Sequence, residues 1–148
     1  IFMSTSNVKE AEKLVESQAS NVKILNDKNA AANLAVKDLE VAKEFYGDIL
    51  GLDQVGAEGQ EVVIYKSGNS TINVYRSQYA GTNKATAVTW TVGANIERVV
   101  EAFKAKGVTF EHYDMPDITR DGDLHIAGDM KVAWFKDPDG NILNIINR

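Results

Sequence analysis

The chain of 148 residues is 44% apolar and 25% charged, which is typical of a globular domain and excludes a collagen-like or intrinsically disordered chain. Its net charge of −5, from 16 basic and 21 acidic residues, opposes binding to nucleic acid, whose phosphates attract basic surfaces. The absence of cysteine excludes disulfides, thiolate metal sites and a cysteine nucleophile.

The same survey limits the partners. No apolar run reaches the ~20 residues that span a bilayer, and the first residues lack the basic and apolar regions of a secretory signal. We therefore expect a cytoplasmic protein that binds no membrane and no nucleic acid. Moderate acidity permits a cationic ligand without implying one.

The first predicted element is a helix over residues 7–25. Apolar residues recur there at the three- and four-residue spacing of an amphipathic helix, namely at Val8, Ala11, Leu14, Val15, Ala19 and Val22. Because this segment resembles nothing downstream, we interpret residues 1–28 as an N-terminal helical arm that packs on the domain or on a second subunit. A mobile tail is the alternative.

Residues 29–148 form the predicted domain, and its first module spans about residues 30–77. A strand is expected at 30–36, followed by a helix at 38–50 that Asp38 caps and Gly51 ends. Three strands follow near 52–55, 61–66 and 71–76, separated by turns that contain glycine. The order of elements is therefore β-α-β-β-β.

The same order returns in a second module over about residues 85–148. It comprises a strand at 86–92, a helix at 95–106 that Gly107 ends, and strands at 108–113, 131–136 and 142–146. Gly107 lies 56 positions after Gly51, and such a fixed spacing indicates an internal duplication. An insertion at about residues 115–129 lengthens the second copy.

Two segments resemble a known superfamily. Residues 35–52 read AVKDLEVAKEFYGDILGL and are similar to the opening of a module in the glyoxalase, bleomycin-resistance and extradiol-dioxygenase (vicinal oxygen chelate) superfamily. Residues 133–145 read AWFKDPDGNILNI and resemble its closing hairpin. The resemblance covers about residues 30–148. It implies an α+β fold in which two βαβββ modules form a cupped, mixed eight-stranded sheet, with an extra N-terminal helix here, and it implies a homodimer.

Many members of that superfamily bind a divalent metal at four positions. Matching these positions to this chain gives Ala31, Asn73, Ala87 and Asn144. Divalent metals need imidazole nitrogen or carboxylate oxygen lone pairs, which alanine lacks and a neutral asparagine carbonyl replaces weakly. We therefore expect no metal and no cofactor at that position and assign no catalytic residue, which argues against metal-dependent catalysis.

Side-chain alternation along the strands predicts which residues line the concave face. Leu34 and Val36 share the apolar face of the first strand, as do Val88 and Trp90 in the second module, and these faces are expected to meet the helices. The opposite faces carry hydrogen-bonding groups and two large aromatic rings, a mixture typical of small-molecule sites. The predicted ligand-binding residues are Asn33, Asn73, Tyr75, Thr89, Thr91, Trp134 and Asn144.

Some side chains leave alternatives open. Tyr75 and Trp134 stack on a ligand or pack in the core, and the asparagines orient a ligand or bind water in an open groove. His112 is expected at the surface of an edge strand. His125 is expected in a solvated loop, with a lid over the cup as the alternative.

The first hypothesis for function is a metal-free protein that holds a small organic ligand in the cup. The alternative is a divalent-metal-dependent lyase, isomerase or dioxygenase with ligands at unusual positions such as Glu61, Glu111 or His125. A third hypothesis is an interaction module whose N-terminal helix docks a partner. It gains support if the cup is filled by its own side chains.

Overall fold

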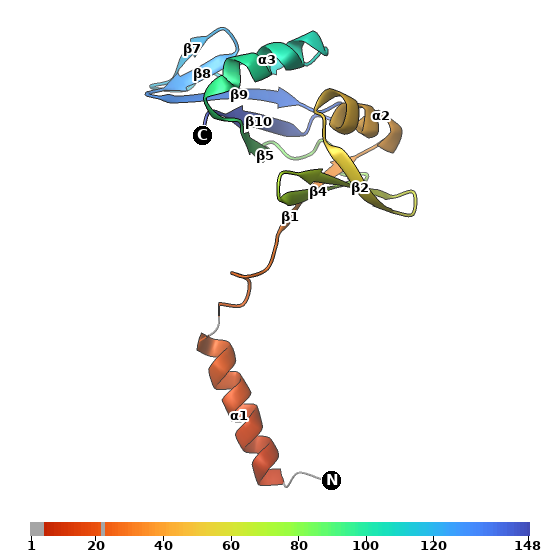
Figure 1. Cartoon of the computed structure of the whole chain (residues 1–148), viewed down its shortest axis with the longest axis vertical. Coiled ribbons are helices and arrows are strands. Elements are labelled where there is room, and N and C mark those ends of the chain that lie inside the picture. The colour runs from red at the N-terminus through yellow and green to blue at the C-terminus, as the bar shows by residue number, and fades with distance from the viewer. Residues whose placement is uncertain (1–4, 22) are drawn as a thin grey trace. The chain divides into compact units, whose positions relative to one another are not determined.

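The computed structural model describes residues 5–21 and 23–148 and divides into an N-terminal unit, Ile1–Ala30, and a compact unit, Ala31–Arg148. The N-terminal unit contains helix α1 (Thr5–Asn21), so the predicted helix is confirmed, although it ends four residues earlier than expected (Figure 1). Val22 lies outside the described residues. Within the described ranges, no helix has both the length and the apolar character needed to cross a bilayer.

The first module of the compact unit is a four-stranded sheet with helical turns between its first two strands (Figure 1). Its strands are β1 (Ala31–Val36), β2 (Asp53–Glu58), β3 (Val62–Ser67) and β4 (Ser70–Arg76). They are arranged in the order β1-β4-β3-β2, with β1 parallel to β4 and the other pairs antiparallel. The predicted helix is made of α2 (Leu39–Lys43) and the π-helix η1 (Glu44–Ile49).

Local interactions fix both ends of this helix. Asp38 caps it, since its side chain accepts a hydrogen bond from the backbone N–H of Glu40 at 2.9 Å. The last turn widens because the N–H of Leu50 donates to the carbonyl of Phe45, five residues back, at 2.9 Å. Gly51 then adopts a φ of 78°, a conformation that suits glycine at the end of a helix.

The second module repeats this plan with two additional strands. Its helices are the short 3-10 helix η2 (Gly93–Asn95) and α3 (Ile96–Ala105). Its strands are β5 (Thr86–Thr91), β6 (Phe110–Glu111), β7 (Thr119–Asp121), β8 (Leu124–Ala127), β9 (Met130–Lys136) and β10 (Ile142–Ile146). They are arranged in the order β5-β10-β9-β8-β7, and β6 also pairs with β9.

The α+β class and the two βαβββ modules are thus confirmed. The described chain has ten strands in two sheets, because residues 115–129 do not remain a loop: they fold into the β7–β8 hairpin, which extends the second sheet. The predicted strand at 108–113 is reduced to β6, since the N–H of Tyr113 donates to Nε2 of His125 at 2.9 Å and not to a neighbouring strand. His125 lies on β8 and is 2% exposed, so the expectation of a solvated loop was wrong. His112 is exposed, as predicted.

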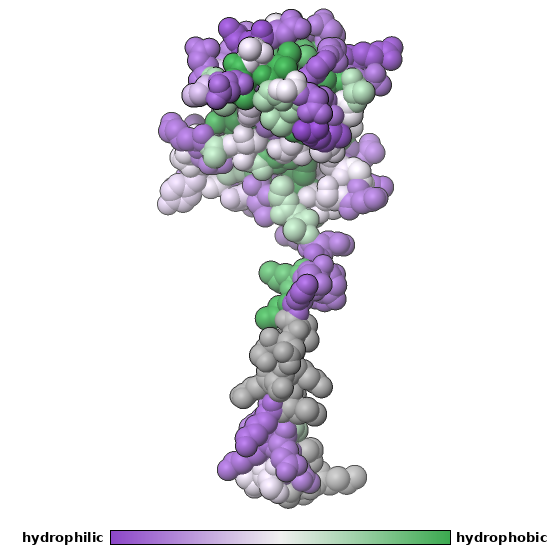
Figure 2. Space-filling view, turned by 90° about the vertical axis from the view of Figure 1, so that its left-hand side faces the viewer, coloured by the Kyte–Doolittle hydropathy of each residue, from purple (hydrophilic) through white to green (hydrophobic). Residues whose placement is uncertain are grey.

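The predicted division of the strand faces is also confirmed. Leu34 and Val36 are buried, whereas Asn33 on the opposite face of β1 is exposed. On β5, Trp90 faces the core and stacks on Phe135, with ring centroids 6.4 Å apart. The face of the compact unit seen in Figure 2 is largely hydrophilic, with hydrophobic residues visible between the polar ones.

The two modules pair within one chain through buried and half-buried polar bonds. Nδ2 of Asn141 donates to the carbonyl of Ala35 at 2.8 Å, and Nε1 of Trp90 donates to Oγ of Ser67 at 2.8 Å. Both bonds join residues of different modules. They hold the two sheets in a fixed relation, with β1 and β5 in contact.

Candidate functional site

A hollow of about 460 Å³ lies on the face of the first sheet that carries Asn33. Strand register explains its composition: Asn33 is opposite Asn73, and Tyr75 lies two residues further along β4 on the same face. These three predicted ligand-binding residues therefore come together. The full lining is Asn33, Glu58, Val62, Ile64, Asn73 and Tyr75.

The two asparagines of the hollow are bonded to each other. Nδ2 of Asn73 donates to Oδ1 of Asn33 at 3.2 Å. Because each amide carries both a donor and an acceptor group, this bond leaves Nδ2 of Asn33 and Oδ1 of Asn73 for another molecule. The pair therefore presents one donor and one acceptor on neighbouring strands.

Three lining residues were not predicted. Glu58 lies at the end of β2, which was expected to end at residue 55, so the sequence placed this carboxylate in a turn. Val62 and Ile64 alternate along β3, opposite Tyr75 and Asn73 respectively. That alternation was the available signal, but apolar residues of this kind more often belong to a core.

The other four predicted residues lie on the second sheet. Thr89, Asn144 and Trp134 form one row across β5, β10 and β9, and Thr91 lies in the next row. Asn144 is 8% exposed, and its Oδ1 is buried without a hydrogen-bond partner in the described part of the chain. None of the four lines the hollow of the first sheet.

Trp134 packs against rings of its own chain. Its ring centroid is 4.8 Å from that of His125 and 5.5 Å from that of Tyr113, both in edge-to-face geometry. Its Nε1 donates to Oγ1 of Thr86 at 3.0 Å. Burial lowers the pKa of His125, which keeps this imidazole neutral and able to accept the Tyr113 N–H. Of the two predicted roles of Trp134, packing in the core is therefore met in part, since its half-buried indole contacts two rings of its own chain.

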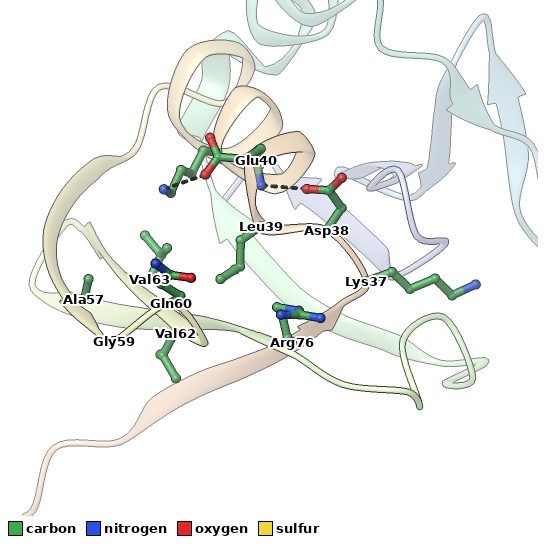
Figure 3. A pocket seen from close by; sticks show the side chains of 11 residues that line it. Lys37, Asp38, Leu39, Glu40, Ala57, Gly59, Gln60, Val62, Val63 and Arg76 are labelled. Atoms are coloured by element: carbon green, nitrogen blue, oxygen red, sulfur yellow. Dashed lines mark hydrogen bonds and ion pairs between the residues drawn. The ribbon is translucent and has the colours of Figure 1, made fainter.

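A larger groove of about 600 Å³ lies beside α2 and the β2–β3 turn (Figure 3), and of the residues that line the hollow only Val62 also lines this groove. Leu39 points into it from the helix, whereas Lys37 points away. Most of its charged side chains already have partners, and Arg76 pairs with Glu61 at 3.3 Å. Lys43 pairs with Glu40 at 3.1 Å, and Asp38 caps the helix. This groove is therefore the weaker candidate for a ligand site.

Comparison with known protein families identifies the superfamily to which the chain belongs. The family model described as Glyoxalase/Bleomycin resistance protein/Dioxygenase superfamily matches residues 29–145. The chain belongs to this superfamily. No curated protein sequence matches the chain.

Solved structures show the same fold at low sequence identity. Lactoylglutathione lyase from Agrobacterium tumefaciens is 18% identical with a TM-score of 0.61, and the match covers 81% of this chain and 92% of that chain. The fosfomycin resistance protein FosX from Listeria monocytogenes is 14% identical with a TM-score of 0.64, covering 82% and 93%. An integron cassette protein from V. cholerae is 20% identical with a TM-score of 0.56, covering 81% and 94%.

The residues at the superfamily's metal positions do not fit a divalent metal. Ala31 and Ala87 offer no side-chain lone pair, and Asn73 already bonds Asn33. Across residues 5–21 and 23–148, no three carboxylate or imidazole groups converge closely enough to hold a metal ion. The alternative ligands do not meet either: Glu61 pairs with Arg76, Glu111 lies near Lys136, and His125 holds the backbone of Tyr113.

Proposed function

We propose that this superfamily member is a small-molecule-binding protein that holds an organic ligand on its concave face without a metal. The observation that carries the proposal is the hollow of the first sheet. It combines an amide pair, the phenol of Tyr75 and two aliphatic side chains in about 460 Å³. Small-molecule pockets typically enclose roughly 300–1,000 Å³ and share this mixture of apolar walls and a few polar groups.

The row on the second sheet supports a second half of the same site. A buried carbonyl oxygen without a partner costs about 1–3 kcal/mol, so the Oδ1 of Asn144 is a place where a ligand donor would be favourable. In the proposal, Trp134 turns away from Thr86 and stacks on the ligand. Thr89 and Thr91 supply hydroxyl groups beside it.

A fragment titration followed by NMR tests the binding proposal. Small aromatic and aliphatic fragments are expected to shift the side-chain amide signals of Asn33 and Asn73. Tyr75→Ala should weaken the affinity roughly tenfold through lost ring contact. Tyr79→Ala is the matched control, because Tyr79 is 67% exposed and does not line the hollow. Fragments that shift only residues of the α2 groove would contradict the proposal.

The proposal also includes the assembly and location expected from the sequence. We infer a cytoplasmic homodimer in which residues 29–148 are the binding domain and residues 1–28 an added arm. The superfamily resemblance supports the dimer. Light scattering should give twice the chain mass of 16.2 kDa, and a monomer at micromolar concentration would contradict this part.

A further inference from the structure

The hollow of the first sheet contains one carboxylate and no basic side chain. Glu58 is its only charged lining residue, and in the described ranges its carboxylate forms neither a hydrogen bond nor an ion pair, although its backbone carbonyl accepts from the N–H of Glu61. Two other glutamates near the same sheet are neutralised: Glu40 pairs with Lys43, and Glu61 pairs with Arg76 at 3.3 Å. The hollow thus presents a negative charge that no ion pair among the described residues compensates.

Strand register places an aromatic ring across from this carboxylate. Glu58 is opposite Val62 on β3, and Val62 is opposite Tyr75 on β4. Neighbouring strands lie ~4.8 Å apart, so the two groups stand at the ends of one row with an aliphatic side chain between them. Carboxylates and aromatic faces both attract cations. The next row adds the free Oδ1 of Asn73, which accepts hydrogen bonds.

We propose that the hollow selects an organic monocation, an ammonium or guanidinium group on an apolar body. The cation lies between Glu58 and Tyr75 and donates to Oδ1 of Asn73, while the apolar body covers Val62 and Ile64. An anionic ligand would meet the charge of Glu58 with no basic side chain to offset it. The inference rests on the proposed function and specifies the ligand class of the same site.

Three molecules with one phenylbutyl body test the charge preference in the full-length protein: phenylbutylammonium, phenylbutanol and phenylpentanoate. Affinities are measured by NMR titration at low ionic strength. The ammonium is expected to bind roughly fivefold more tightly than the alcohol, and the carboxylate more weakly than the alcohol. Added salt should reduce the difference, because exposed charges are screened.

Two matched variants assign the preference to one side chain. Glu58→Gln should lower the ratio of ammonium to alcohol affinity from roughly fivefold to about one. Glu61→Gln removes the same charge three residues away, outside the hollow, and should keep the preference. Both residues are exposed, so unchanged unfolding temperatures should show that the fold is intact.

The outcomes separate this inference from the proposed function. If the alcohol shifts the signals of Asn33 and Asn73 but the ammonium binds no better, the cation preference is overturned and small-molecule binding stands. If the preference survives Glu58→Gln, the assignment to Glu58 is overturned. If none of the three molecules shifts these signals at millimolar concentration, both proposals fail.

Discussion

The hydroxyl of Tyr46 makes a buried bond between the two modules. It donates to Oδ2 of Asp137 at 2.7 Å, and burial, followed by the charge of Asp137, raises the pKa of this phenol far above its ordinary value. Tyr46→Phe removes the donor and should lower the free energy of unfolding by about 1–2 kcal/mol in urea titrations. Tyr65→Phe is the control: its hydroxyl forms no hydrogen bond in the described chain, and a similar loss there would refute this account.

His125 should make stability depend on pH. Burial lowers its pKa from an ordinary value of 6.5, and the positive charges of His112 and Arg120 act in the same direction. The unfolded chain therefore takes up this proton more readily than the folded chain. The stability that neutral His125 contributes to the folded chain is complete above pH 6.5 and is lost as the pH falls below that value.

Urea titrations at neutral and mildly acidic pH check this expectation. The wild type should lose more stability between about pH 7 and pH 5 than His125→Gln does. His112→Gln, which changes the other histidine, should keep most of the loss, because burial is the main cause of the lowered His125 pKa. An equal loss in the wild type and His125→Gln would exclude His125 as its source.

Alternation along a strand was the most reliable guide at the residue scale. It correctly grouped Asn33, Asn73 and Tyr75 on one face, because backbone geometry alone decides which side of a sheet a side chain takes. It could not place Glu58, since the end of an edge strand depends on its pairing partner. It could not show that His125 would be buried opposite Val132, a contact that depends on how the insertion folds. Whether these residues bind a ligand stays a prediction.

At the scale of elements, the turn at residues 137–141 packs closely against the segment that links the two modules, residues 78–84. A Cβ added to Gly81, whose φ is 75°, would lie 2.1 Å from the carbonyl oxygen of Asp139. Gly81→Ala should therefore lower the free energy of unfolding by more than about 3 kcal/mol, because the backbone must move. Gly68→Ala has a similar φ of 57° but meets nothing within 4 Å, so it should cost only about 1–2 kcal/mol.

Thermal and urea unfolding of the two glycine variants separate conformational strain from close packing. A difference between them reports the contact of Gly81 with Asp139, since both variants carry the strain of a positive φ. Equal losses would show that the turn and the link are not held together in solution.

The sequence predicted the long elements because their periodicity reflects burial on one side. It missed β7, whose three residues, Thr119–Asp121, are all exposed and carry no apolar pattern. It also missed the π-helical turn of η1. That turn is defined by backbone bonds, such as the one from Leu50 to Phe45, that no side-chain pattern encodes.

At the scale of the whole molecule, folding should not depend on a metal. The residues at the superfamily's metal positions do not form a chelating set, so treatment with EDTA should change the unfolding temperature by less than about 1 °C. Metal analysis of the purified protein before and after EDTA accompanies the melting curves. Loss of a stoichiometric divalent metal together with a lower unfolding temperature would reverse the proposed function in favour of a metalloenzyme.

Each module begins and ends on neighbouring parallel strands, β1 beside β4 and β5 beside β10. The two ends of a repeat therefore lie next to each other, and a short bridge is enough to connect one copy to the next. A module of this kind can therefore be repeated in tandem within one polypeptide without a long connection between the copies.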